Sequence, residues 1–237
     1  MTVYAVGDIH GQREMLEHAL DLIAADGGAD APIVFVGDLV DRGPDARGVI
    51  QMLIDGQAEG RDWTVVRGNH DQLFLEFLED GRIWFERIRS GISWLNPRMG
   101  GNTTLASYGV TATEDTPNWQ AARDAVPDAH KVFIRDLPWH HELSELLFVH
   151  AGIDPRKPLE WQDPQDLIWI RDPFLRYTEP HLWLIVHGHT PGDHPEHCGN
   201  RVNLDGGAGY GRPLVPAVFE GRDVSLLTDQ GRVPLRP

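Results

Sequence analysis

Five short apolar runs are spaced along the chain, and each of them breaks off into a polar segment. The runs cover residues 3–6, 33–36, 63–66, 146–149 and 182–186. Continuous Val, Ile and Leu runs of this length are typical of strands that are buried on both faces. In α/β sheets, ligand-binding groups collect beyond the carboxyl ends of such strands. The pattern therefore predicts one cleft that gathers polar residues from distant parts of the chain.

Two stretches between the first three runs carry apolar residues at helical spacing. The first is apolar at positions 15, 16, 19, 20, 22 and 23 and ends at Asp26-Gly27-Gly28. The second extends from about residue 45 to 54 and directs Val49 and Leu53 inward. A β-α-β-α-β beginning of this kind predicts parallel strands joined by right-handed crossovers.

The pattern changes after His70. Positions 73, 74, 77 and 78 form an apolar helical stripe, Gly100-Gly101-Asn102 interrupts it, and a second helix is expected at 119–125. We expect residues 72–131 to form a mainly helical cap insertion over one side of the cleft. A hairpin is predicted at 139–149 around Ser144-Glu145, followed by short strands at 201–204, 214–219 and 224–227. Because there is no repeat or linker, residues 1–237 are predicted to form a single α/β domain.

Composition narrows the class of protein. Acidic residues number 36 against 21 basic ones, and the formal charge of -15 makes nucleic-acid binding unfavourable. Cys198 is the only cysteine, so neither an intrachain disulfide nor a thiolate metal site is expected. The sequence has no leader pattern and no apolar run near the roughly 20 residues that span a bilayer. We therefore expect a cytoplasmic protein with no membrane partner.

Residues with metal-ligand chemistry stand directly after the apolar runs. Carboxylates, imidazoles and one amide suit Mn²⁺, with Fe or Zn²⁺ as other choices. Two divalent ions about 3.5–4 Å apart that share a carboxylate and a water are the arrangement for phosphoryl displacement by a hydroxide. The candidate ligands are Asp8, His10, Asp38, Asn69, His150 and His189.

The remaining polar groups can complete such a reaction. Arg42 and Arg171 can hold phosphate oxygens through their guanidinium groups, beside the amide of Asn69. His70 can protonate a departing alkoxide, and Asp41 can orient its imidazole. No nucleophilic side chain is required.

Five motifs, in order, resemble the phosphoprotein phosphatase family of calcineurin-like metallophosphoesterases, in particular its bacterial and phage-encoded Ser/Thr protein phosphatases. They are Gly7-Asp8-Ile9-His10-Gly11, Gly37-Asp38-Leu39-Val40-Asp41-Arg42-Gly43, Arg67-Gly68-Asn69-His70-Asp71, His150-Ala151-Gly152 and Gly188-His189-Thr190-Pro191. The resemblance implies a central β-sandwich of mixed sheets flanked by helices. It also implies a dinuclear centre usually active with Mn²⁺, and hydrolysis of phosphate monoesters.

The same resemblance distributes the ligands between two ions. One ion takes Asp8, His10 and Asp38, and the other takes Asp38, Asn69, His150 and His189. Related enzymes often end this motif in a second histidine, whereas this chain has Pro191 there. His189 is therefore assigned as the ligand, and His187 as a supporting or packing residue.

The expected function is a metal-dependent phosphoprotein phosphatase that acts on phosphorylated Ser or Thr, and on Tyr as a further option. Its substrate would be a phosphorylated protein or a small phosphomonoester. The nearest rival is a symmetrical bis(5'-nucleosyl)-tetraphosphatase, although bacterial enzymes of that kind commonly carry alanine where this chain has Asp41. A non-catalytic binding protein on the same fold is a third hypothesis.

Structural interpretations of the same residues stay open at the level of sequence. Asp8 and Asp38 can cap turns or helices, and Asp41 with Arg42 can form an ordinary turn ion pair. Arg171 can pair with Asp172 or Asp166. The native metal, the oligomeric state, the phospho-residue preference and the roles of Tyr210, His187 and the cap are not specified.

Overall fold

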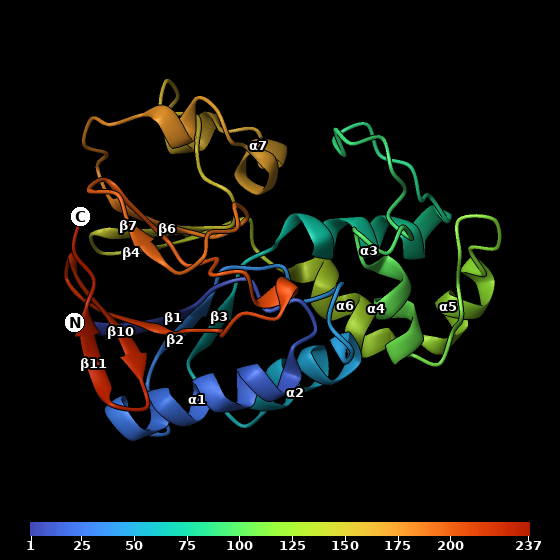
Figure 1. Cartoon of the computed structure of the whole chain (residues 1–237), viewed down its shortest axis with the longest axis horizontal. Helices are drawn as coiled ribbons and strands as arrows, with labels where there is room; N and C mark the ends of the chain where they lie inside the picture. Colours follow the sequence, from blue (N-terminus) through green and yellow to red (C-terminus); the bar gives the residue numbers. More distant parts are fainter.

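Two mixed sheets form the centre of the protein, as the computed structural model of residues 1–237 shows (Figure 1). The first sheet has the order β11-β10-β9-β1-β2-β3. Its strands are β1 Thr2–Val6, β2 Ile33–Phe35, β3 Trp63–Val65, β9 Ala217–Glu220, β10 Asp223–Thr228 and β11 Gly231–Pro234. The pairs β1–β2 and β2–β3 are parallel, which confirms the predicted β-α-β-α-β beginning.

The second sheet has the order β4-β5-β6-β8-β7. Its strands are β4 His140–Leu143, β5 Leu146–Val149, β6 Leu184–His187, β7 Glu196–His197 and β8 Arg201–Asn203. The antiparallel β4–β5 pair is the predicted hairpin, while β5, β6 and β8 are parallel neighbours. The fold class predicted from the sequence, an α/β protein with two mixed sheets flanked by helices, is confirmed.

The alternation of side chains along β1 explains how the first sheet packs against helices on one face and against the second sheet on the other face. Val3 and Ala5 belong to a buried cluster that also contains Phe148 and Val186 of the second sheet. Tyr4 and Val6 belong instead to the larger cluster beneath the helices. Successive side chains of a strand point to opposite faces, so a continuous apolar run can fill two cores at once.

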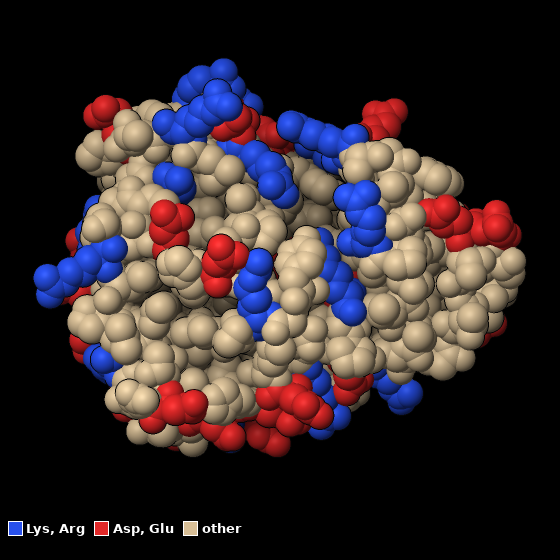
Figure 2. Space-filling model, in the orientation of Figure 1, with Lys and Arg blue, Asp and Glu red and all other residues tan.

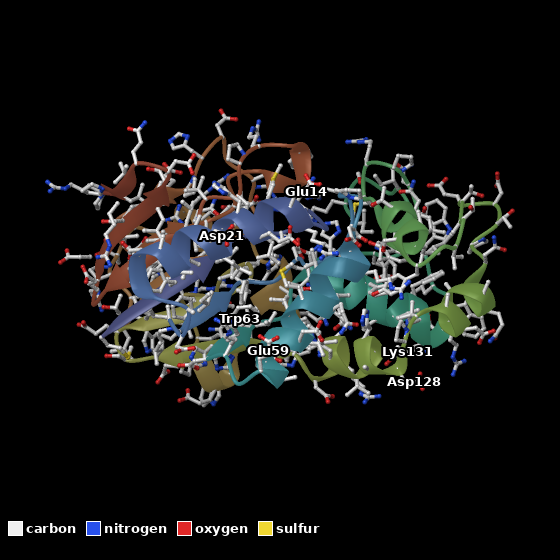
Figure 3. All side chains as sticks on the ribbon, turned by 90° about the horizontal axis from the view of Figure 1, so that it is seen from below. Glu14, Asp21, Glu59, Trp63, Asp128 and Lys131 are labelled. Carbon is white, nitrogen blue, oxygen red and sulfur yellow. The ribbon has the colours of Figure 1, made fainter.

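Helices α1 (Arg13–Gly27) and α2 (Ala46–Ala58) cover the outer face of the first sheet. Asp45 begins α2 as its N-cap and accepts a hydrogen bond from the Gly48 amide at 2.8 Å. Gly56 lies inside α2 because a Cβ there would overlap the Trp63 ring. In the view from below, charged residues such as Asp21 and Glu59 lie along this outer layer (Figure 3).

Four helices occupy the region between β3 and β4: α3 Asn69–Asp80, α4 Gly101–Ser107, α5 Trp119–Ala125 and α6 Asp128–Asp136. The predicted break at Gly100-Gly101-Asn102 is wrong, because α4 begins there. Gly100 adopts the left-handed conformation (φ 94°) and serves as the N-cap of α4. A glycine at such a site marks the start of a helix as readily as an interruption.

The cap shares its apolar core with the body of the protein. Phe74 and Trp94 belong to the same buried cluster as Leu16 and Phe35 of the α1 and β2 layer. We therefore propose that the chain is a single domain and that the helical region is an insertion within it. Its last helix, α6, extends past residue 131 to Asp136.

The chain between β5 and β6 contains α7 (Pro164–Trp169) and short 3₁₀ turns at Leu159–Trp161 and Phe174–Arg176. Asp163 caps α7 by accepting a hydrogen bond from the Gln165 amide at 2.9 Å. A third 3₁₀ turn, Ala208–Tyr210, follows β8. No helix has the length and apolar character required to cross a bilayer. The cytoplasmic location stays a prediction.

Candidate metal centre

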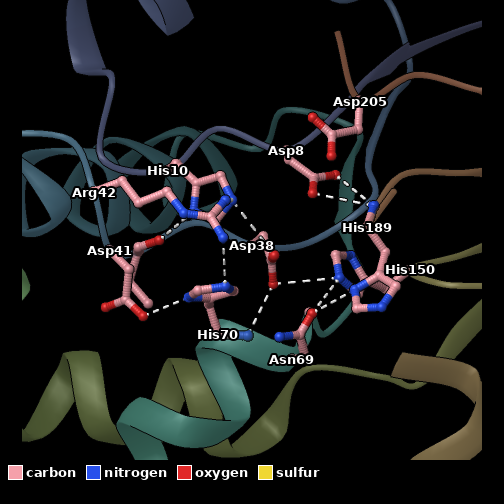
Figure 4. Close-up of polar contacts among 12 residues, drawn as sticks. Asp8, His10, Asp38, Asp41, Arg42, Asn69, His70, His150, His189 and Asp205 are labelled. Carbon is pink, nitrogen blue, oxygen red and sulfur yellow. Dashed lines mark hydrogen bonds and ion pairs between the residues drawn. The ribbon is translucent and has the colours of Figure 1, made fainter. Parts of the chain in front are cut away.

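The six predicted ligands meet at the ends of strands from both sheets (Figure 4). Asp8, Asp38 and Asn69 follow β1, β2 and β3, and His150 and His189 follow β5 and β6. All six have exposed fractions of 8% or less. We call Asp8, His10, Asp38, Asn69, His150 and His189 the ligand cluster.

One half of the ligand cluster is centred on Asn69. Its Oδ1 lies 2.9 Å from His150 Nε2 and 2.8 Å from His189 Nδ1. His150 Nε2 is also 3.3 Å from Asp38 Oδ1. His150 Nδ1 donates to the Val36 carbonyl at 2.8 Å, which leaves Nε2 unprotonated and able to bind a metal ion.

The other half contains His10 and the second oxygen of Asp38, with His10 Nε2 3.6 Å from Asp38 Oδ2. His10 Nδ1 donates to the Val40 carbonyl at 2.8 Å, so its Nε2 is also left unprotonated. The Arg42 guanidinium donates to that Nε2 at 2.5 Å and to His70 Nε2 at 3.1 Å. The cationic Arg42 guanidinium thus contacts the imidazole nitrogens of both His10 and His70.

Asp38 joins the two halves. Its carboxylate belongs to a group with His10 and His70 and to a second group with Asp8 and His150. In each group the candidate ligand atoms lie within 4.8 Å of one another. Asp38 Oδ1 also accepts a hydrogen bond from the His70 amide at 2.9 Å, at the start of α3. Asp38 therefore bonds to the first turn of α3 and also belongs to both candidate metal groups.

Asp205 is a buried carboxylate that the sequence pattern did not assign to the site. It is 3% exposed, lies beside Asp8 (Figure 4) and accepts a hydrogen bond from the Gly207 amide at 3.0 Å. Asp8 accepts the His189 amide at 3.2 and 3.1 Å. The sequence does contain a signal for Asp205, because Asp205-Gly206 follows β8 much as Gly7-Asp8 follows β1.

Burial makes the cluster electrostatically unfavourable without cations. It raises the pKa of Asp38 to about 8. Burial, together with the charges of Asp205 and Asp38, raises the pKa of Asp8 well above its usual range. Burial also lowers the pKa of His150 to about 4, so this imidazole is neutral. Crowded carboxylates beside neutral imidazoles with directed lone pairs are a donor set that fits divalent cations.

His70 and Asp41 form a buried pair at the edge of the cluster. His70 Nδ1 lies 2.6 Å from Asp41 Oδ2, and Asp41 is fully buried. Two cap residues complete its hydrogen bonds: Trp94 Nε1 donates to Oδ2 at 2.7 Å, and Thr104 Oγ1 donates to Oδ1 at 2.6 Å. Burial raises the pKa of Asp41 to about 7, and the bonds from Thr104 and Trp94 oppose that rise.

The backbone at Asp41 and Arg42 is strained and is held by the cap. Both residues are left-handed, with φ of 71° and 67°, a conformation that costs about 1–3 kcal/mol for a residue with a side chain. Thr104 Oγ1 accepts the Asp41 amide at 2.8 Å. Gly100 lies so close to the Arg42 backbone that a Cβ would collide with it. The alternative interpretation, a turn ion pair between Asp41 and Arg42, is not realised, and Asp41 pairs with His70 instead.

No local pattern in the sequence pointed to Trp94 or Thr104. Trp94 stands in a segment without helical or strand periodicity, and its size alone indicated a place in the cap core. Thr104 stands where the sequence suggested an interruption rather than a helix. Their contacts with Asp41 span 53 and 63 positions of the chain.

A cleft of about 750 Å³ opens over the ligand cluster. Its walls include Arg42, Arg171, Trp169 and Tyr210, and the Arg42 guanidinium lies 4.8 Å from the centre of the exposed Tyr210 ring. Arg171 is exposed, and its Nη2 is 3.5 Å from the His189 carbonyl oxygen.

The structural alternatives for Arg171 are not realised. Asp172 pairs with Arg176 at 3.2 Å, and Asp166 pairs with Lys157 at 3.9 Å. His187 is buried and packs against Phe174, with 5.1 Å between the centres of the two rings. Arg171 therefore remains available to the cleft.

The sequence profile of the calcineurin-like phosphoesterase family matches residues 1–221. The chain belongs to this family. The resemblance drawn from the five motifs is thereby confirmed. Metallophosphoesterases use a dinuclear metal centre, and the two overlapping groups around Asp38 are the candidate positions in this chain.

Individual relatives differ in their assigned activities. Serine/threonine-protein phosphatase 1 of Salmonella typhimurium is 29% identical over 237 residues, covering 91% of this chain and 90% of that protein. The asymmetrical bis(5'-nucleosyl)-tetraphosphatase PrpE of Halalkalibacterium halodurans is 24% identical, covering 97% and 94%. A cold-active protein-tyrosine phosphatase of a Shewanella species has the same fold, with a TM-score of 0.63 at 17% identity over 99% of this chain and 80% of that one. Membership supports phosphoester hydrolysis and leaves its substrate open.

Proposed function

We propose that this phosphoesterase is a metal-dependent phosphoprotein phosphatase that releases phosphate from phosphomonoesters. The observation that carries the proposal is the His70–Asp41 pair at the edge of the ligand cluster, in which His70 lines the cleft and Asp41 is buried behind it. Hydrolysis of a serine or threonine phosphate leaves an alkoxide, a poor leaving group that needs a proton. His70 would supply it from Nε2 once the Arg42 guanidinium, which donates to that nitrogen at 3.1 Å in this structure, has moved away and Nε2 carries a proton.

The ligand cluster would hold two divalent ions, for which Mn²⁺ is our first choice and Fe or Zn²⁺ the alternatives. Asp8, His10 and Asp38 would serve one ion; Asp38, Asn69, His150 and His189 would serve the other. Such ions supply Lewis acidity and lower the pKa of water, so no protein nucleophile is needed. Cations held near His10 would repel the Arg42 guanidinium from its present position and favour its movement into the cleft.

Arg42 and Arg171, which both line the cleft, would then hold the phosphate oxygens. Their planar guanidinium groups match the oxygens of a phosphate and would stabilise the charge that develops during transfer. Asp41 would keep the His70 ring oriented through Nδ1, which directs Nε2 toward the departing oxygen. Trp94 and Thr104 would fix Asp41 in turn and act only through it.

The direct test uses leaving groups of different basicity. We expect His70→Asn to lower kcat on a phosphoserine peptide by about 10²–10⁴-fold. The loss on p-nitrophenyl phosphate should be much smaller, because its leaving group needs little protonation. Metal content, measured by mass spectrometry, should stay unchanged. If wild-type protein in Mn²⁺ releases phosphate from no phosphoserine, phosphothreonine or phosphotyrosine peptide, the proposal is wrong.

A bis(5'-nucleosyl)-tetraphosphatase is the second candidate, because PrpE covers nearly the whole chain. PrpE is an asymmetrical tetraphosphatase, whereas the sequence motifs suggested the symmetrical enzyme as the rival function. Diadenosine tetraphosphate assayed beside the peptides, with its products separated by chromatography, would decide between these functions. A non-catalytic binding protein is the third candidate, and turnover of either substrate class would exclude it.

A further inference from the structure

The segment 81–100 between α3 and α4 contains neither helix nor strand, and we call it the cap loop. It carries two exposed arginines, Arg87 and Arg89, that line the same cleft as the ligand cluster. Ile88 between them is 6% exposed and belongs to the main apolar core. The buried isoleucine anchors the loop, and the two arginines flank it on the cleft side.

The ends of this part of the loop are fixed to each other. The Trp94 amide donates to the Ile83 carbonyl at 2.7 Å and closes the loop at its base. The Ile88 amide donates to the Phe85 carbonyl at 3.1 Å. With Trp94 also bonded to Asp41, the loop has a defined position relative to the metal centre.

Arg87 and Arg89 form no ion pair and no side-chain hydrogen bond, unlike Arg82 of the same loop. Arg82 is bonded to Asp80 at 2.7 Å and to Glu76 at 3.0 Å. Two unpaired guanidinium groups on one short loop repel each other unless an anion lies between or beside them. Their positive charge is therefore not used within the protein.

The cleft contrasts with the rest of the surface. The whole chain has a formal charge of -15, yet the cleft is lined by four arginines, Arg42, Arg87, Arg89 and Arg171, against the carboxylates Asp38 and Glu86. Figure 2 shows basic side chains around the central hollow and acidic ones along the lower edge, over the α1 and α2 layer. Arg42 and Arg171 suffice to bind one phosphate. Arg87 and Arg89 are therefore free to bind another anionic group.

The cleft also continues past Arg87. A smaller cavity of about 380 Å³ shares Glu86, Arg87 and Trp169 with it and has Trp84 and Phe85 in its wall. Trp84 is 56% exposed. A substrate that lies across Arg87 can therefore extend beyond the site of hydrolysis instead of ending there.

We propose that Arg87 and Arg89 form a second anion-binding site, which holds a negatively charged group of the substrate beyond the phosphate that is hydrolysed. The proposal rests on phosphoester hydrolysis at the ligand cluster. The group it would bind is an oxyanion, either an acidic side chain near a phosphorylated residue or a further phosphate of a polyphosphate chain. With such a site, kcat/KM would be higher for substrates that carry two separated anionic groups than for simple phosphate monoesters.

The test compares wild type with Arg87→Gln/Arg89→Gln on matched substrates at constant free Mn²⁺. One phosphoserine peptide carries glutamates around the phosphoserine, and its partner carries glutamines. We expect kcat/KM for the acidic peptide to fall by about 10-fold, the scale of an Arg–oxyanion contact that water partly screens. The glutamine peptide should change by less than about twofold. Arg98→Gln, exposed on the same loop but not part of the cleft lining, is the matched control.

Diadenosine tetraphosphate forms the other arm and identifies the source of the second anion. A loss confined to the peptide points to an acidic side chain, and a loss confined to the dinucleotide points to a phosphate. Equal losses on all substrates, the glutamine peptide included, would overturn the proposal, as would unchanged kinetics on both charged substrates.

A binding measurement separates this inference from the proposed function. Fluorescence polarisation would follow a labelled acidic peptide in which a nonhydrolysable phosphonate replaces the phosphoserine. We expect weaker binding to the double variant by about 10-fold, whether or not the protein hydrolyses phosphopeptides. If wild type hydrolyses no peptide and yet binds the phosphonate through Arg87 and Arg89, the proposed function fails and the anion site stands. Equal affinity of both proteins for the peptide, together with unchanged kinetics on diadenosine tetraphosphate, would refute the site.

Discussion

The ligand cluster and the cap loop face the same cleft but are built in opposite ways. The cluster residues are buried and follow strands, and backbone groups such as the Val36 and Val40 carbonyls hold their rings. The cap loop has no regular structure and exposes Arg87 and Arg89. Rigid strand ends suit groups that must keep fixed distances, while a loop can vary the groups that recognise a substrate.

The two regions are nevertheless linked by one buried side chain. The Trp94 side chain extends from the cap loop into the core. It donates a hydrogen bond to Asp41, which orients His70. The cap therefore holds His70 through Asp41 and, in our proposal, also recognises the substrate. Four predictions test how far the cluster and the cap can be separated.

Asp38→Asn should have the largest effect, because Asp38 belongs to both candidate metal groups. Loss of one or both ions removes several kcal/mol of transition-state stabilisation per ion, so we expect kcat to fall by at least about 10⁴-fold. Metal analysis should show less than two bound ions. Full metal content with near-normal turnover would disprove the bridging position of Asp38.

Substitution of the two cap residues that bond Asp41 should have an intermediate effect. Trp94→Phe and Thr104→Val each remove a hydrogen bond to a buried carboxylate, which we expect to cost about 1–3 kcal/mol of unfolding free energy. Misorientation of His70 should lower kcat by about 10- to 100-fold with little change in KM. Urea unfolding and steady-state kinetics measure the two effects.

The leaving group again supplies the control for these variants. If Trp94 and Thr104 act through His70, their loss of kcat should be larger on phosphoserine peptides than on p-nitrophenyl phosphate. Equal loss on both would mean that the cap residues support the fold alone. Ser107→Ala, which removes a cap hydroxyl bonded to the Arg47 amide and the Thr104 carbonyl rather than to Asp41, should leave the ratio unchanged.

The stability of the metal-free protein should depend on pH in a defined direction. Burial raises the pKa of Asp38 to about 8 and of Asp41 and Asp71 to about 7, while the unfolded carboxyls titrate near 3.8. Between pH 6.5 and 8 the folded state therefore binds more protons, and its unfolding free energy falls as pH rises. The buried histidines, whose pKa values burial lowers, oppose this trend in the lower part of the window, because unfolded histidines still bind protons there, and their opposition fades toward pH 8.

We expect a decrease of about 1–2 kcal/mol across that window in the presence of a chelator. Saturating Mn²⁺ should abolish it, since cations replace the protons on the carboxylates. Urea unfolding at pH 6.5 and 8.0, with and without metal, measures the difference. A metal-free protein that becomes more stable toward pH 8 would contradict protonated carboxyls in the folded cluster.

Tyr210→Leu should have the smallest effect. Its exposed ring lies 4.8 Å from the Arg42 guanidinium, a contact worth about 0.5–1 kcal/mol. Loss of the ring should raise KM for phosphopeptides by about 2- to 5-fold and leave kcat unchanged. Tyr210→Phe keeps the ring face and should match wild type. A drop in kcat for both variants would show instead that the hydroxyl takes part in the reaction.

Prediction from sequence was most direct for candidate ligands that follow a strand. Asp8, Asp38 and His150 each follow an apolar run within a few positions, so the period of the strand and the polar switch locate them together. Prediction was weaker where the sequence shows neither helical nor strand periodicity. Gly100 was interpreted as an interruption and instead starts α4, and the short edge strands β7 and β11 were not predicted.

The order and type of the main elements, the family and the candidate ligands were thus determined by the sequence alone. Short-range patterns encode them, because burial, strand alternation and helical spacing act over a few residues. Only the tertiary structure decided that Trp94 and Thr104 reach Asp41, that Asp205 joins Asp8, and that Arg87 and Arg89 face the cleft. Those contacts depend on the path of irregular segments across the core, and no local periodicity specifies such a path.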